Sequence, residues 1–378
     1  IIWGHSCMPA MQSGAESSPL LTVAQQLLPW LTDHVLRKCA HFAEYAVLGA
    51  LTAAALRTSA HFSWPRALLP GPFAALCDET IQLFVPGRSG QIADVWLDTA
   101  GYLTGALLTL LIFIALLALM GGVLWQNICY NRTHYTAEFY QIHSRKLTQS
   151  CRVVFLTDLH LREYGADNCE LVQDVRSLAP DLILLGGDLV TYGEGSDYDN
   201  MLSLCSQLNE IAPVCGVLGN HEDELYFLDG DQALVEKFTA AGVTILRNQE
   251  ARYTVRDNVI SILGVEGSPE DFYNYGASTF MDSVEPQTDY DLRICLAHVP
   301  TYFTEHLENY SFELGLAGHT HGGIVRLPKI GPLYSAEEGF FPDYAGGSYA
   351  LANNATLIVS RGLGNSSRAP RINNVPEL

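Results

Sequence analysis

The chain has 378 residues, of which 48% are hydrophobic, and its formal net charge at pH 7 is −20. Seven acidic and six basic residues precede position 133, which leaves 34 acidic and 15 basic residues after it. Such an acidic second part repels nucleic acid, so nucleic-acid substrates are disfavoured, while the length and apolar content suit a membrane part joined to a soluble one.

The first predicted elements are three apolar stretches, at residues 39–56, 67–85 and 99–125. The last has 27 residues without a charge, and about 20 apolar residues suffice for a helix to cross a bilayer. A soluble helical domain is the alternative, because it would tolerate Glu44 and Asp78 at lower cost. The long uncharged run favours membrane-spanning helices.

Ionisable residues occur in and beside these stretches at helical spacing: His41, Glu44, Asp78, Glu79, Asp94 and Asp98. In each stretch they fall on one face of the expected helix. Charges at membrane depth are costly unless they face a bundle interior or a polar cavity. The sequence therefore predicts one buried polar cluster, whose chemistry the residues do not reveal.

This region resembles the VanZ-like membrane family in the order of its motifs. The motifs are Arg37-Lys38-x-x-His41-Phe42-x-Glu44-Tyr45, Asp78-Glu79-x-x-Gln82-x-Phe84-x-Pro86-Gly87-Arg88-x-Gly90 and Asp94-x-x-x-Asp98. The resemblance implies an all-α transmembrane bundle, expected over residues 1–125 and followed by a linker at 126–135. Residues 1–3 resemble the end of the family's first membrane helix, so we expect the chain to be truncated before them.

Five strand-like runs follow, at residues 152–156, 182–185, 213–218, 292–296 and 312–316. Each ends at a short polar motif: Asp158-Leu159-His160, Gly187-Asp188, Gly219-Asn220-His221-Glu222, His298, and Gly318-His319-Thr320-His321-Gly322. Polar turns after buried strands meet at the carboxyl edge of a sheet, where α/β folds build their sites. Their oxygen and nitrogen donors are enough for a centre of two metals.

The segments between these runs predict the remaining architecture. Helices are expected at 169–178, 200–211 and 232–241, an edge strand at 137–142, and further β-structure at 251–265 and 356–360. We therefore expect residues 136–378 to form an α/β four-layer sandwich of two mixed β-sheets flanked by helices. We also expect the chain to be incomplete after its last residues, Val375-Pro376-Glu377-Leu378.

The five motifs resemble those of the calcineurin-like metallophosphoesterases. By that resemblance, Asp158, His160, Asp188 and His321 hold one metal, and Asp188, Asn220, His298 and His319 hold the other. Asp188 bridges the two ions. His221 is no ligand in this pattern; it protonates the leaving oxygen or holds a phosphoryl oxygen. One departure is Thr191, where many relatives have an acidic residue beside the ligands.

The segment at 327–349 carries the aromatic residues Tyr334, Phe340, Phe341, Tyr344 and Tyr349. One interpretation is a surface loop whose aromatics pack on the sheet. The other is an apolar wall beside the metals that receives a lipid chain or enters the membrane interface. Residues 318–328 and 361–364 resemble the branch that contains the UDP-2,3-diacylglucosamine pyrophosphatases.

These patterns predict a membrane-anchored enzyme with two divalent ions, which the mixed nitrogen and oxygen donors suggest are manganese, iron or zinc. It would hydrolyse a phosphate ester or pyrophosphate bond in a phosphorylated, lipid-linked or cell-envelope metabolite, with the lipid bilayer and not nucleic acid as its partner. The alternative is a VanZ-like binding or transport module with a sensory or inactive phosphoesterase appendage.

The expected location is a bacterial cell membrane, with the phosphoesterase facing the cytoplasm. With three predicted spans, five basic residues lie on the same membrane side as the phosphoesterase domain: Arg57, Arg66, Arg132, Arg145 and Lys146. Three lie on the opposite side, namely Arg37, Lys38 and Arg88. Basic residues near membrane helices favour the cytoplasmic face. The nine scattered cysteines, without framework spacing, favour reduced thiols.

Overall fold

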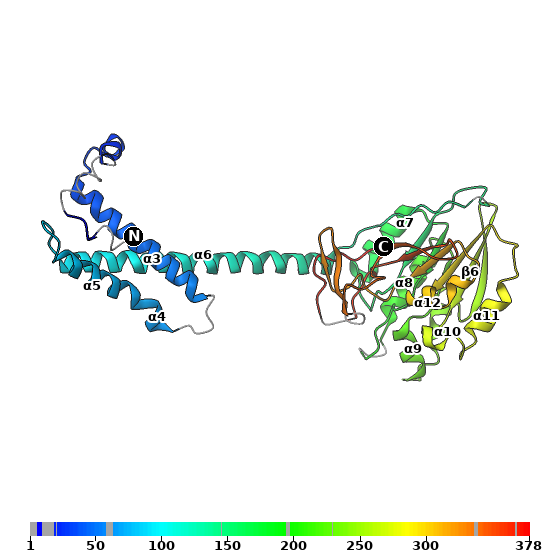
Figure 1. Cartoon of the computed structure of the whole chain (residues 1–378). Coiled ribbons are helices and arrows are strands. Elements are labelled where there is room, and N and C mark those ends of the chain that lie inside the picture. The colour runs from blue at the N-terminus through cyan, green and yellow to red at the C-terminus, as the bar shows by residue number, and fades with distance from the viewer. Residues whose placement is uncertain are drawn as a thin grey trace. The chain divides into compact units, whose positions relative to one another are not determined.

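The structure is a computed structural model that describes residues 6–9, 19, 21–57, 63–144, 146–193, 197–228, 230–335, 339–366 and 369–378. It divides into two compact units, Ile1–Val123 and Leu124–Leu378, whose elements are drawn in Figure 1. The expectation about residues 1–3 lies outside the described residues. We describe each unit by itself.

The first unit is helical. Its elements are α3 (Asp33–Arg57), α4 (Trp64–Leu68), α5 (Pro70–Gln82) and α6 (Ile92–Thr133), the last of which continues into the second unit. Among the described residues, α3 and α6 are the two helices that are long and apolar enough to cross a membrane. The expected helix at 67–85 is instead divided by a break at Leu69, and α5 has only 13 residues.

Helices α3 and α6 run parallel and pack closely through small residues. A Cβ on Gly105 would lie 1.8 Å from the carbonyl oxygen of Ala46, and one on Gly101 would lie 2.4 Å from that of Phe42. Backbones approach this closely only where glycine removes the side chain, as is common between membrane helices. Because the two helices are parallel, the chain has to run back from the end of α3 to the start of α6, and α4 and α5 lie on this return path.

The most apolar 18-residue window of α6 is hydrophobic on all sides, and none of it is buried. A helix that is hydrophobic all round needs an apolar surrounding, which supports association with a membrane. The helix also continues to Thr133, so most of the expected linker at 126–135 is helical. Polar residues near a helix end predict a linker poorly, because a helix tolerates them wherever they remain solvated.

The second unit contains two large sheets. The four-stranded sheet has the order β1-β2-β3-β4, with every pair parallel. The six-stranded sheet has the order β12-β13-β8-β7-β6-β5 and is mixed. The strands are β1 (Val153–Leu156), β2 (Leu182–Leu185), β3 (Val214–Gly216), β4 (Val243–Ile245), β5 (Gln249–Val255), β6 (Asn258–Val265), β7 (Leu292–Ala297), β8 (Leu314–Ala317), β12 (Gly347–Ala350) and β13 (Thr356–Val359).

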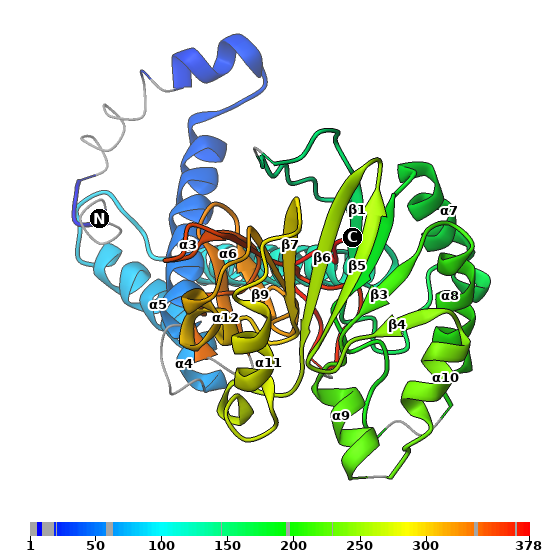
Figure 2. The ribbon, with the colours of Figure 1, turned by 90° about the vertical axis from the view of Figure 1, so that its right-hand side faces the viewer.

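Helices cover the outer faces of both sheets. Figure 2 shows α7 (Cys169–Leu178), α8 (Asp199–Asn209) and α10 (Leu234–Ala240) on one side, and α11 (Ala277–Val284) and α12 (Thr301–Glu305) on the other. Between the sheets, Leu184 and Cys215 of the first belong to one buried cluster with Ile262 and Ile294 of the second. These layers confirm the predicted fold class, although the four-stranded sheet is wholly parallel.

Two segments differ from expectation. Residues 137–142 form no strand; only Thr136 bridges to Glu377, and the amide of Glu138 donates to the carbonyl of Leu378. An alternating pattern reports an extended backbone but not its partner. The expected loop at 327–349 contains strands instead: β9 (Val325–Leu327), β10 (Gly331–Ser335) and β11 (Gly339–Phe340) form a small antiparallel sheet, and β12 begins at Gly347.

Candidate metal centre

The five polar motifs lie at the carboxyl ends of β1, β2, β3, β7 and β8. Three of these strands belong to the four-stranded sheet and two to the six-stranded sheet. Because the sheets pack face to face, the carboxyl ends of all five strands converge, and the seven predicted metal ligands meet there. The convergence depends on the packing of the two sheets and not on neighbouring positions in the sequence.

The first group of donors consists of Asp158, His160 and His321, with ligand atoms within 4.8 Å of one another. Nε2 of His160 lies 3.2 Å from Nε2 of His321. Two nitrogens that each lie about 2.1 Å from a shared ion are about 3.0–3.4 Å apart. The spacing of the two rings therefore fits ligands of one metal.

The second group consists of Asp188, His298 and His319, again with ligand atoms within 4.8 Å. Nε2 of His298 lies 3.1 Å from Oδ2 of Asp188, and Nδ1 of His319 lies 3.0 Å from Oδ1 of Asn220. Oδ2 of Asp188 is also 3.7 Å from Nε2 of His160 in the first group. Asp188 thus stands between the groups, where a bridging carboxylate is expected.

The backbone at these ligands is strained. Asp158, His160, Asp188, His319 and His321 all have φ between 49° and 71°, in the left-handed region. Each such residue costs roughly 1 kcal/mol or more, and strain of this kind gathers at functional sites. Five strained residues among seven predicted ligands indicate a backbone shaped around the site.

Glycines allow the ligand turns to approach one another. A Cβ on Gly219 would lie 2.1 Å from Oδ1 of Asp188, and one on Gly318 would lie 2.2 Å from Oδ2 of Asp158. Any side chain at either position would displace a predicted ligand. Glycine is therefore required at both turns by close packing.

The protonation states of two histidines bear on metal binding. Burial lowers the pKa of His160 to about 4, so its ring is neutral at pH 7 and offers a lone pair. Burial alone would lower the pKa of His298, but the carboxylate of Asp188 raises it to about 10. A proton on His298 therefore balances Asp188, and a metal that takes the same nitrogen can replace it. The donor set fits two divalent ions.

Residues around the ligands fix their orientation. Nδ1 of His298 lies 2.8 Å from the carbonyl oxygen of Gly186, and Oγ1 of Thr191 lies 3.3 Å from Nδ1 of His160. In both rings this leaves Nε2 for the metal. Thr191, the departure from the family pattern, can thus orient His160 with a hydroxyl in place of a carboxylate.

Glu222 holds two of the ligand turns together. Its buried carboxylate accepts hydrogen bonds from the backbone amides of Asp188 (2.7 Å), Val190 (3.0 Å) and Gly219 (2.8 Å). Burial raises its pKa to about 7, and the nearby charge of Asp188 adds to the shift. The sequence motif included Glu222 without a role, because its three partners come from two separate loops.

His221 lies beside both groups without belonging to either predicted ligand set. One ring nitrogen lies within 4.8 Å of the ligand atoms of His160 and Asp188. The backbone amide of Tyr192 donates to Nδ1 of His221 over 3.0 Å. Because Nδ1 accepts this bond, the proton of the neutral ring is on Nε2, as proton transfer to a leaving oxygen requires.

Two family models match this chain. The description "Calcineurin-like phosphoesterase" covers residues 151–323, and "VanZ/LLP1" covers residues 7–115. Residues 151–323 are a calcineurin-like phosphoesterase domain. Since members of that family use dinuclear metal centres, the domain is a metal-dependent hydrolase, and residues 7–115 before it are a VanZ-like domain.

Curated proteins and solved structures are also similar to this chain. The chain is 29% identical to the phosphodiesterase YaeI of Escherichia coli (strain K12), covering 60% of this chain and 80% of the relative. It is 26% identical to the uncharacterized protein YpbG of Bacillus subtilis (strain 168), covering 65% and 85%. The solved structure of the phosphopantetheinyl hydrolase PptH from Mycobacterium tuberculosis matches with a TM-score of 0.36 at 14% identity, covering 57% and 90%.

A cavity of about 320 Å³ opens beside the predicted ligand His160. Three arginines line it, although the domain is strongly acidic, and its walls are Asn131, Arg132, His160, Arg162, Asn365, Ala369, Pro370 and Arg371. Guanidinium groups recognise phosphate through paired hydrogen bonds. The sequence analysis missed these arginines because they come from three distant segments and form no motif.

Arg371 is the most deeply placed of the three. It is buried, and its Nη2 lies 3.3 Å from Nδ1 of the predicted ligand His321. Nη2 donates to the carbonyl of Arg361 over 2.7 Å, while Nε and Nη1 have no hydrogen-bond partner among the described residues. Burial lowers its pKa to about 10, so the group remains a cation at pH 7. Two unpaired donors beside the metal ligands suit an anionic oxygen.

Proposed function

We propose that the protein is an integral-membrane hydrolase whose two metals are held by Asp158, His160, Asp188, Asn220, His298, His319 and His321. Its substrate would be a phosphate ester or pyrophosphate on a lipid-linked or cell-envelope metabolite. The observation that carries the proposal is the cavity beside His160, because Asn131 and Arg132 of α6, the helix that contains the long apolar run, form part of its wall.

Helix α6 connects the apolar run to this cavity. The uncharged run ends at Trp125, and Asn131 and Arg132 of the same helix line the cavity. Six residues of α-helix from Trp125 to Asn131 advance the chain by about 9 Å. If the apolar run lies in the bilayer, the residues of α6 that line the cavity follow it closely along the helix, which supports a substrate carried by a lipid.

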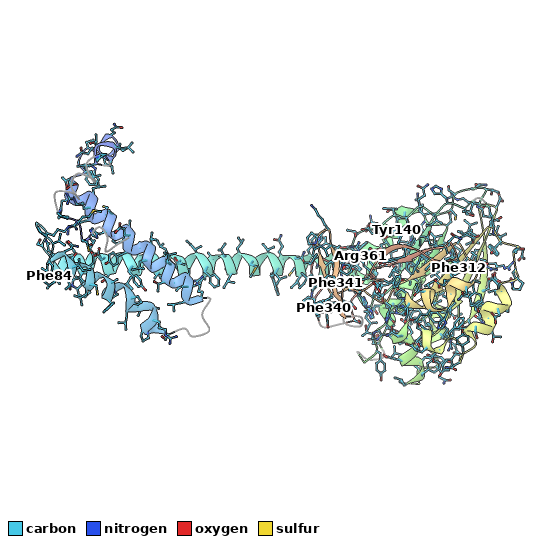
Figure 3. All side chains as sticks on the ribbon, viewed as in Figure 1. Phe84, Tyr140, Phe312, Phe340, Phe341 and Arg361 are labelled. Carbon is cyan, nitrogen blue, oxygen red and sulfur yellow. The ribbon has the colours of Figure 1, made fainter. Side chains whose placement is uncertain are left out.

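An aromatic surface adjoins the same helix end. Phe340 and Phe341 are 72% and 62% exposed, and Figure 3 shows them on the side of the second unit where α6 ends. The connection is direct: the amide of Asn373 donates to Oδ1 of Asn127 in α6, and its neighbour Ile372 bridges to Val325 of β9, in the same small sheet. Exposed phenylalanines at this place suit the membrane interface.

Some aromatic residues of the 327–349 segment support a surface loop packed on the sheet, and others support an apolar surface for lipid. Tyr344 and Tyr349 pack against a buried core cluster, as the surface-loop interpretation expects. Phe340 and Phe341 do not, and they support the interpretation as an apolar surface for lipid.

The side chains of this chain divide the chemistry between them. Two bound divalent ions supply charge neutralisation at a phosphoryl oxygen and activation of water. Arg371, with Arg162 and Arg132, binds the non-reacting phosphate oxygens, and His221 delivers its Nε2 proton to the leaving oxygen. The name of YaeI, a phosphodiesterase, favours a diester or pyrophosphate over a monoester.

The alternative function is a VanZ-like binding or transport module with an inactive phosphoesterase appendage. An inactive domain has no need to keep strained backbone at the predicted ligands or a buried arginine with two unpaired donors beside them. Both features are present here, so we favour an active enzyme.

We also propose that the phosphoesterase faces the cytoplasm of a bacterial cell. Parallel α3 and α6 run in the same direction, and Arg132 follows the apolar run of α6, whereas the guanidinium of Arg57 lies 3.6 Å from the ring centre of Phe113 within that run. Basic residues near helix ends favour the cytoplasmic face. Cys205, Cys215 and Cys295 are free and buried, as suits a reducing compartment.

A substrate panel tests the proposal. The full chain in lipid nanodiscs would be assayed with bilayer-embedded lipid phosphodiesters and pyrophosphates and with their water-soluble headgroups. We expect a higher kcat/KM for an embedded substrate, and a selective loss of that preference in the Phe340→Ser, Phe341→Ser double variant. An equal kcat/KM for both forms would contradict a lipid-linked substrate while leaving the hydrolase assignment intact.

A further inference from the structure

The VanZ-like domain contains a second group of metal-ligand side chains, far in sequence from the phosphoesterase. His41 of α3, Asp78 of α5 and Asp98 of α6 each offer one ligand atom, and these atoms lie within 4.8 Å of one another. Asp78 is completely buried and Asp98 is 1% exposed. The polar cluster predicted from the sequence therefore has a defined centre, to which three helices each contribute one residue.

Most polar atoms of this centre have no protein partner. Among the described residues, neither oxygen of Asp98, nor Oδ1 of Asp78, nor Nδ1 of His41 has a hydrogen-bond partner. Oδ2 of Asp78 accepts a hydrogen bond from Nε2 of Gln82 over 3.3 Å. Three unpartnered carboxylate oxygens beside an imidazole are an unusual arrangement, because buried polar groups are nearly always satisfied.

The neighbouring basic side chains do not neutralise the two aspartates. Arg37 pairs with Asp33, and Lys38 pairs with Asp94. The Nε of Arg88 donates to the carbonyl of Met8 over 2.9 Å. Another acidic neighbour, Glu79, accepts hydrogen bonds from Gln82 and from the amide of Gln91.

An unpaired buried carboxylate is energetically costly, and two side by side cost more. A divalent cation removes this cost, because it satisfies oxygens of both carboxylates and a ring nitrogen at once. Protonation of the aspartates is the competing solution, and it requires no metal.

We propose that His41, Asp78 and Asp98 bind a divalent metal ion that is separate from the two ions of the phosphoesterase domain. One nitrogen and two carboxylate oxygens suit manganese, iron or zinc better than calcium or magnesium, which prefer oxygen ligands alone. A cavity of about 210 Å³, lined by His41 and Asp98 together with Glu79 and Gln82, gives the ion a path to the site and leaves room for further ligands. The ion cross-links α3, α5 and α6.

Metal analysis of the full chain tests this site. The detergent-purified protein would be stripped of metal and dialysed against Mn²⁺, and bound metal per chain would be measured by elemental analysis. We expect about three ions in the wild type, falling by one in Asp98→Asn and in His41→Gln. The matched control is Asp33→Asn on α3, whose carboxylate pairs with Arg37 and does not line the cavity, so this variant should retain all ions.

A background variant separates the two metal centres. In Asp188→Ala, which disables the phosphoesterase centre, one Mn²⁺ site should remain by titration calorimetry, and adding Asp98→Asn should abolish it. Circular dichroism and thermal denaturation of the single Asp98→Asn variant report whether its helices are still folded. Two ions in the wild type, or a remaining site in the Asp188→Ala, Asp98→Asn double variant, would overturn the proposal, and neither result bears on the phosphoesterase.

Discussion

Nε2 of His298 lies 3.1 Å from Oδ2 of Asp188, and this contact joins the two large sheets. His298 follows β7 of the six-stranded sheet, whereas Asp188 follows β2 of the four-stranded sheet. Both side chains are buried, and both belong to the same group of donors. The metal centre therefore exists only when the two sheets are packed together.

Replacement of Asp188 should empty the centre. Its carboxylate stands between the two donor groups, so Asp188→Ala is expected to lose most of both phosphoesterase ions. Elemental analysis of the purified full chain measures this loss. Glu236→Ala, an exposed residue on α10, is the control and should keep them. Full phosphoesterase occupancy in Asp188→Ala would rule out the bridging role.

Metal binding should release protons. Asp188 raises the pKa of His298 to about 10 against the effect of burial, so at pH 8 the ring carries a proton that a metal on Nε2 must displace. Apparent affinity for Mn²⁺ is therefore expected to rise as the pH rises toward 10. Calorimetry in two buffers of different ionisation enthalpy measures the released protons. Identical binding heats in both buffers would show that no proton leaves.

Loss of His221 should affect chemistry but not metal content. His221→Ala is expected to keep the ions and to lower turnover about 10²–10⁴-fold on a substrate with a poor leaving group, because proton transfer is lost. Nitrophenyl esters should be much less sensitive, since their leaving group needs little protonation. Wild-type turnover by the variant on an alkyl phosphodiester would exclude the proton-donor role.

Arg371 should act on substrate binding through the geometry of its guanidinium group. Arg371→Lys keeps the charge but loses the planar fork, and a charged hydrogen bond contributes about 1.5–3 kcal/mol, so kcat/KM should fall roughly 10–100-fold. The control is Arg256→Lys, an exposed ion pair with Asp181 that lies outside the cavity. Steady-state kinetics on one phosphodiester compare the variants, and an unchanged kcat/KM for Arg371→Lys would remove Arg371 from the substrate site.

The sequence predicted the elements that repeat a simple pattern. Helix α7 has the expected bounds, and β1 and β2 fall within the expected runs, because apolar periodicity reports burial. The seven predicted ligands converge, since a strand that ends in a polar turn presents that turn at a fixed edge. Short elements with long-range partners were less accessible: β4 was not predicted, and residues 137–142 have the strand pattern without a paired strand.

The surroundings of the site could not be predicted in the same way. Arg371, Arg162 and Asn131 line one cavity although they lie far apart in the chain, and none belongs to a motif. The three amides that bond Glu222 come from two loops. Such contacts depend on how the elements pack in the folded chain. They leave no local pattern in the sequence from which they could be predicted.

Metal-dependent hydrolysis by the full chain in nanodiscs tests the central claim most directly. The stripped protein would be titrated with Mn²⁺ while hydrolysis of bis-p-nitrophenyl phosphate is followed. An active enzyme predicts turnover that appears with added metal and is absent from Asp188→Ala. Filled phosphoesterase sites without turnover on this substrate or on the lipid panel would contradict the account and favour a sensory or inactive phosphoesterase domain.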